Sequence, residues 1–148
     1  MKIIDLRVMR GPNYWSVKHP KIIVIKLALE DLSQTLTNQV PDFLKRLKTT
    51  FPGMVSHRSS EGVEGGFFKT VEEGTTFGHV VQHVALELQT MAGMDSGYGR
   101  CYPAKEEGHL IVVFSYQEER AGEYAAYAAV RVTQALVKGD KYKLADDI

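Results

Sequence analysis

The sequence predicts an α+β fold in which a mostly antiparallel sheet carries helices packed on one face. Two strand-like stretches open the chain, two more precede its last helical stretch, and the other helical stretches lie between these pairs. Helices that do not alternate singly with strands favour this class over a parallel α/β sheet. With 148 residues, of which 44% are hydrophobic and 24% charged, the chain fits one soluble globular domain.

The first strand is predicted over residues 2–9, where apolar and polar residues alternate, and the second over residues 21–29. These two stretches are expected to pair. Between them lies the turn-rich segment RGPNYWS, which contains the single tryptophan, Trp15. The polar residues 30–38 are expected to form a loop.

The first helix is predicted to open at Pro41, because proline is favoured in the first helical turn. Its apolar stripe is formed by Phe43, Leu44, Leu47 and Phe51. Pro52 and Gly53 are expected to end it.

A glycine-rich loop of mixed charge, residues 57–66, follows. Residues 67–73 are expected to form a short helix or strand. Thr75 or Thr76 is expected to cap the next helix, which runs to about Ala92 and stops at Gly93.

Residues 97–103 and 108–117 are predicted to be the third and fourth strands, and residues 118–137 a long alanine-rich helix. The polar residues 139–148 are expected to be a linker that follows a domain of residues 1–138.

Charge and cysteine content restrict the class of protein. Lysine plus arginine equals aspartate plus glutamate, at 18 each. This balance argues against a nucleic-acid-binding protein, which needs a basic field. The single cysteine, Cys101, excludes an internal disulfide and fits a cytoplasmic protein. No apolar run is long enough to span a membrane, and the N-terminus is not a signal peptide.

The third predicted helix places His79 and His83 one turn apart on one face, where two imidazoles can share a zinc ion. Glu87 lies eight residues past His79, about 12 Å along a helix axis. It is therefore expected to orient His83 from behind rather than to bind the metal. The third ligand is expected from Glu119 or Glu118, with Glu123 a weaker candidate.

An alternative is that the two histidines are ordinary residues beside the core. Val80, Val84 and Leu88 form an apolar stripe on the same helix, and histidines at this spacing often occur without a metal. Glu118 and Glu119 then only begin the last helix, where its dipole favours acids.

Five segments are RGPNYWS at 10–16, EGGF at 64–67, GHVVQHVALELQTMAGM at 78–94, YGR at 98–100 and YQEERAG at 116–122. Together they resemble the N-terminal domain of cyanophycin synthetases. The resemblance implies a domain that binds cyanophycin, a poly-aspartate backbone with arginine on each side-chain carboxylate. It implies other synthetase domains as partners, of which an ATP-grasp domain would come first after residues 139–148. ATP and magnesium would be used only in those other domains. In some members it also implies a zinc-dependent hydrolase site that cuts the polymer into primers.

The motif of that site is H-x-x-E-H, and in this sequence the glutamate position is Gln82. The arrangement is also similar to that of pitrilysin peptidases, whose third ligand is a downstream glutamate. Glutamine can hydrogen-bond a water molecule but cannot take its proton, which predicts a loss of cleavage of about 10²–10⁴-fold. Either a deliberate substitution or natural loss of cleavage explains Gln82, and its near-isosteric form favours the first.

The polymer offers one carboxylate and one guanidinium per unit, so its groove should contain basic, acidic and aromatic groups. The residues expected to contact it are Arg100, Gly65, Gly66, Arg58, Glu64 and Trp15. Weaker candidates are Arg10, Lys69, Glu61, Glu72, Glu73, Tyr14 and Tyr98. Two other classes remain open, namely a binding module that tethers polymer without cutting it and a structural domain that supports oligomerisation.

Overall fold

The computed structural model describes residues 1–16, 18–57, 64–95 and 97–140. In that part of the chain four strands form one antiparallel sheet in the order β1-β2-β4-β3. The strands are β1 (Lys2–Met9), β2 (Ile22–Ala28), β3 (Gly99–Pro103) and β4 (His109–Ser115). The predicted pairing of the first two strands is confirmed, and β1 and β3 lie at opposite edges of the sheet.

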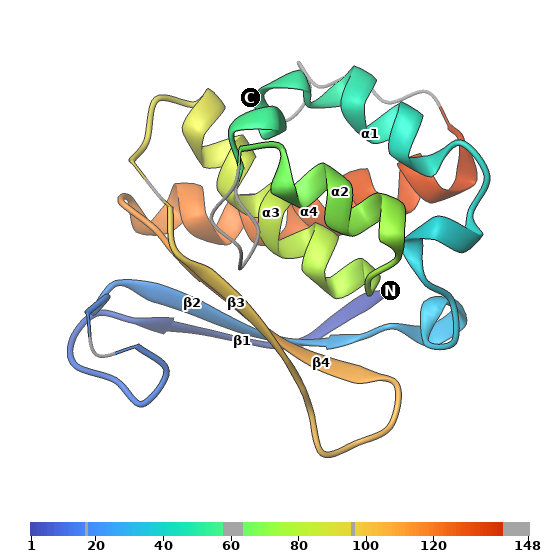
Figure 1. Ribbon diagram of the computed structural model, residues 1–148. Helices are drawn as coiled ribbons and strands as arrows, with labels where there is room; N and C mark the ends of the chain where they lie inside the picture. The colour runs from blue at the N-terminus through green and yellow to red at the C-terminus, as the bar shows by residue number, and fades with distance from the viewer. Residues whose placement is uncertain (17, 58–63, 96, 141–148) are drawn as a thin grey trace.

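The helices lie on one side of the sheet, as Figure 1 shows, so the predicted α+β class is confirmed. They are α1 (Phe43–Thr50), α2 (Gly66–Glu73), α3 (Phe77–Met91) and α4 (Glu119–Lys138). Three short 3-10 turns accompany them, η1 (Glu30–Leu32), η2 (Thr37–Gln39) and η3 (Pro52–Ser56). The stretch 30–38, expected to be loop, thus contains η1 and the start of η2.

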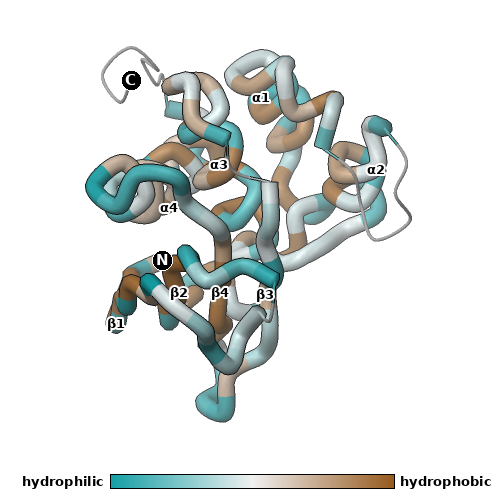
Figure 2. The backbone as a smooth tube through the Cα atoms, turned by 90° about the vertical axis from the view of Figure 1, so that its left-hand side faces the viewer, coloured by the Kyte–Doolittle hydropathy of each residue, from teal (hydrophilic) through white to brown (hydrophobic). Residues whose placement is uncertain are grey.

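The core lies between the helices and the inner face of the sheet. Ile23, Ile25 and Leu27 of β2 point into it, while Ile22 and Val24 lie on the outer face. This alternation is the period of two expected of a strand. In Figure 2 the tube of β4 is brown along much of its length whereas β3 is pale. No residue of β3 is buried, as befits an edge strand, whereas five of the seven residues of β4 are.

Helix α3 is buried along most of its length because it is packed between α4 and the sheet, with Phe67 of α2 stacked on His83. The hydroxyl of Thr76 accepts a hydrogen bond from the backbone N–H of His79 at 3.3 Å, which confirms Thr76 as the N-cap. Helix α1 begins at Phe43, two residues after the predicted start, since Asp42 has a left-handed φ of 61°. No helix among the described residues has the length and apolarity needed to cross a membrane.

Candidate functional site

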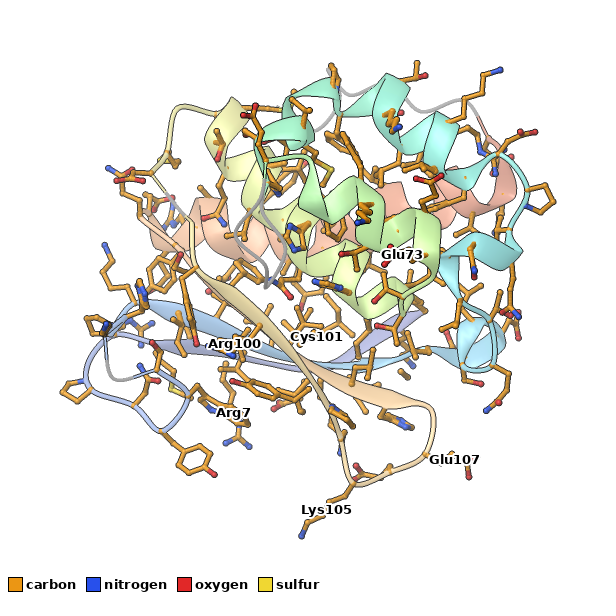
Figure 3. All side chains as sticks on the ribbon, viewed as in Figure 1. Arg7, Glu73, Arg100, Cys101, Lys105 and Glu107 are labelled. Carbon is orange, nitrogen blue, oxygen red and sulfur yellow. The ribbon has the colours of Figure 1, made fainter. Side chains whose placement is uncertain are left out.

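A groove of about 770 Å³ lies between α3 and the edge strand β3. His79, Gln82 and His83 line it from the helix, and the segment from Gly97 to Pro103 lines it from the other side. The helix that was predicted to carry the site therefore does face a cavity. Figure 3 shows Cys101 between β3 and the helices.

His79 and His83 lie side by side, with ring centroids 4.9 Å apart. The ring of Phe67 stacks on His83 at 3.7 Å and meets His79 edge-on at 5.3 Å, which holds both imidazoles in place. Burial lowers the pKa of His79 and lowers that of His83 well below its ordinary value. Both rings are therefore neutral at pH 7, the state in which an imidazole offers a lone pair.

His57 links His83 to Glu87. Its Nδ1 lies 2.9 Å from Nδ1 of His83, and its Nε2 lies 3.3 Å from Oε1 of Glu87. Because a carboxylate only accepts, Nε2–H of His57 donates to Glu87. Nδ1 of His57 then accepts from Nδ1–H of His83, so the network leaves the lone pair of His83 on Nε2.

His79 has a comparable anchor, since its Nδ1 lies 3.1 Å from Oγ1 of Thr75. This contact leaves Nε2 of His79 without a partner among the described residues. Glu87 was predicted to orient His83, and in the structure its contact is with His57, which in turn meets His83. The sequence analysis did not identify His57.

Gln82 is 5% exposed, and its Oε1 has no hydrogen-bond partner within the described ranges. A Cβ at Gly99 would lie 2.6 Å from Nε2 of Gln82, so glycine at 99 allows the amide to pack against the strand. Gln82 therefore presents a buried, unpaired acceptor at the groove.

The structure does not bring Glu118 or Glu119 to the histidines. Glu118 caps α4 by accepting from the backbone N–H groups of Arg120 and Ala121. Glu119 accepts from Arg10 at 2.6 and 2.9 Å, a bidentate pair that lowers the pKa of Glu119. Arg10 follows β1, at the sheet edge opposite β3 and about 14 Å from it by ordinary strand spacing.

A three-ligand zinc site is thus incomplete in this arrangement. Across residues 1–16, 18–57, 64–95 and 97–140, no three His, Cys, Asp or Glu side chains are placed to hold one metal ion. Two imidazoles fit zinc chemistry, but neither predicted carboxylate is available as the third ligand.

A second hollow of about 390 Å³ lies on the other side of β3. It shares Tyr98, Arg100 and Tyr102 with the main groove, and Trp15, Lys18 and His19 are among its other lining residues. The rings of His19 and Tyr98 stack at 4.3 Å, and those of Trp15 and Tyr102 lie 6.1 Å apart. Arg100 and Trp15, both predicted to contact a ligand, therefore border one aromatic and cationic surface.

The predicted glycine pair does not line either hollow. Gly65 adopts a left-handed φ of 76° as the N-cap of α2, and Gly66 is buried in its first turn. Glu64 is exposed in the preceding turn, and Arg58 lies outside the described residues. The two glycines thus start α2, and glycine adopts the left-handed φ at position 65 without strain.

Comparison with known proteins agrees with the resemblance drawn from the sequence. A family model described as "Cyanophycin synthase-like N-terminal domain" matches residues 24–138. The chain is 45% identical over 146 residues to a cyanophycin synthetase of Synechocystis sp., covering 99% of this chain and 17% of the relative. It is 44% identical over 146 residues to that of Trichormus variabilis, covering 99% and 16%. The chain spans about a sixth of the length of these relatives.

Proposed function

The chain belongs to the cyanophycin synthase-like N-terminal domain family, and from this premise we propose that it binds the aspartate–arginine polymer across β3 without cutting it. The observation that supports this proposal is the pair of hollows on either side of β3, with Arg100 bordering both. In a parent synthetase, the ATP- and magnesium-dependent elongation would belong to other domains.

The chemistry of the lining suits a ligand that carries both charges. Arg100 can hold a carboxylate through two parallel hydrogen bonds, and Lys18 adds a second positive charge beside it. The rings of Trp15, Tyr98 and Tyr102 offer faces on which guanidinium groups stack. A polymer with one carboxylate and one guanidinium in each unit can use both kinds of contact.

The absence of cleavage rests on the groups nearest the helix. Gln82 has no basic oxygen to take a proton from water. Burial raises the pKa of Cys101 to about 11, so its thiol is protonated at neutral pH and is a poor nucleophile. The described side chains of the groove thus hold and orient a ligand better than they break one.

Binding is tested with purified cyanophycin fragments and the Arg100→Ala variant. Loss of a charged hydrogen-bonding partner should weaken the affinity about tenfold or more. The matched control is Arg7→Ala, because Arg7 lies on the opposite edge strand with 70% of its side chain exposed, and its ion pair is with the nearby Asp5. Equal affinity of the two variants would refute binding at β3. If neither the parent chain nor either variant bound the fragments, a structural role in oligomerisation would be left.

A second candidate function is zinc-dependent cleavage by the form with glutamate at 82. It is favoured by the contacts of His79 and His83, which involve Nδ1 of each ring and not Nε2. Bound zinc would supply an activated water. The test is to incubate Gln82→Glu with cyanophycin and zinc. Uncut polymer in the presence of bound zinc would rule out the peptidase activity, and no bound zinc after metal analysis would rule out the site.

A further inference from the structure

Strand β3 has one edge that no described strand covers. On its inner edge it pairs with β4, where Tyr98 C=O accepts from Ser115 N–H at 2.8 Å and Ala104 N–H donates to His109 C=O at 3.1 Å. In an antiparallel pair, every second residue directs its backbone N–H and C=O toward the partner strand, so Arg100 and Tyr102 direct theirs toward β4 as well. Gly99, Cys101 and Pro103 therefore direct theirs outward.

The outward groups form a short ladder. Gly99 and Cys101 each offer one N–H and one C=O, while Pro103 has no N–H and offers only its C=O. Proline at this position is compatible with an edge strand, because a central strand would need the missing donor. Among the described residues none of these outward groups has a backbone partner.

The two hollows lie on the two sides of this strand. Cys101 and Gly99 face the groove beneath α3, as their closeness to Thr76 and Gln82 shows. Tyr98, Arg100 and Tyr102 border the second hollow with Trp15. The side chains of any other extended chain would also alternate between two faces, with the same period of two residues.

Gln82 adds an independent sign of a missing partner. Its side chain packs against Gly99, it is 95% buried, and its Oε1 accepts no hydrogen bond from a described residue. A buried acceptor left unpaired is costly, so a donor supplied by a ligand in the groove would satisfy it.

We propose that an extended polyamide docks on β3 as a fifth strand, pairing with Gly99 and Cys101 and sending alternate side chains into the two hollows. This inference rests on the proposed function, since the poly-aspartate backbone of cyanophycin is such a polyamide. It presents one N–H and one C=O per residue at the pitch that the edge of β3 requires. Its arginine-bearing side chains then reach Arg100 and the aromatic rings on one face and the groove beneath α3 on the other.

The test is amide hydrogen exchange of the labelled chain, read residue by residue, with and without a soluble aspartate–arginine oligomer. Binding should slow exchange at Gly99 and Cys101 by about tenfold or more, because their N–H groups become hydrogen-bonded. Arg100 and Tyr102 should change little, since β4 already holds their N–H groups. A bound oligomer that leaves Gly99 and Cys101 unprotected overturns this mode of docking while the proposed function stands. An oligomer that does not bind at all overturns both.

A pair of variants separates backbone pairing from side-chain contact. Cys101→Pro removes the outward N–H together with the thiol, at a position whose extended neighbours accept proline, whereas Cys101→Ala removes the thiol and keeps that N–H. The proline variant should bind the oligomer about threefold to tenfold more weakly than the alanine variant, as expected for one hydrogen bond. Circular dichroism and the exchange of β4 amides check that the sheet is intact. Equal affinity of the two folded variants would overturn the docking mode.

Discussion

Replacement of His57 by alanine should destabilise the domain and change the tautomer of His83. His57 bridges two buried groups, Glu87 at 5% exposure and His83 at 7%. Removing its imidazole leaves Oε1 of Glu87 and Nδ1 of His83 without their partners. Each buried polar group that loses its hydrogen bond costs about 1–3 kcal/mol.

The expected loss is about 2–4 kcal/mol, because His57 is 13% exposed in its side chain and water can reach part of the vacated space. For a domain of this size that corresponds to a fall in Tm of roughly 5–15 °C. Thermal unfolding followed by circular dichroism measures it. His109→Ala is the matched control, since the hydrogen bond of the His109 ring is to the nearby Glu107 carbonyl, and it should cost less than about 1 kcal/mol.

Nitrogen-15 shifts of the histidine rings report the tautomer directly. In the parent chain, Nδ1 of His83 should carry the proton, and in His57→Ala this preference should be lost. Glu87→Gln still offers His57 an oxygen acceptor, so it should keep the tautomer and lose less stability. If His57→Ala unfolds at the same temperature as His109→Ala, or if the His83 shifts do not change, the link from Glu87 through His57 does not exist.

Three further predictions follow from the same groove. Burial lowers the pKa values of His79 and His83, so the unfolded chain binds more protons than the folded chain below about pH 6.5. The free energy of unfolding should therefore fall as the pH drops through that value. Urea titrations at several pH values measure this dependence, and His83→Phe should reduce it. With its pKa near 11, Cys101 should react with a thiol reagent at pH 8 about 100-fold more slowly in the folded chain than in urea, and equal rates would show that the thiol is not buried. Gly99→Ala should cost roughly 1–3 kcal/mol, because the new Cβ would lie 2.6 Å from Nε2 of Gln82, whereas Gly97→Ala, with nothing within 4 Å of its Cβ, should cost little.

The fold was largely predictable because its signals are local. Alternation marked the strands, and a threonine followed by a helical apolar pattern marked the start of α3. The segment 67–73 could not be assigned between helix and strand, and Phe67, Phe68 and Val71 show why. They are spaced so that one helical face is buried, but the segment is too short for its period to decide.

The candidate site was predictable only where its residues share one helix. His79, His83 and Glu87 follow from helical spacing, but His57 is 26 residues from His83 and stands alone in a loop. Similarly, Glu119 was chosen as a ligand because it follows the last strand, whereas its partner is Arg10, 109 residues away. Such pairings depend on which edge of the sheet each strand occupies, and that order is not local information.

Gln82 illustrates how the surroundings decide what one residue can do. A carboxylate in its place would occupy a site that is 95% buried, and Oε1 there has no described donor. Burial without hydrogen bonds disfavours the charged form, so the pKa of such a glutamate should rise toward neutrality, the range in which a general base works best. The same burial makes that charge costly unless a cation balances it, whereas the amide of Gln82 carries none. Glutamate at 82 would therefore be charged only with a cation beside it and protonated otherwise, whereas glutamine is neutral in either case.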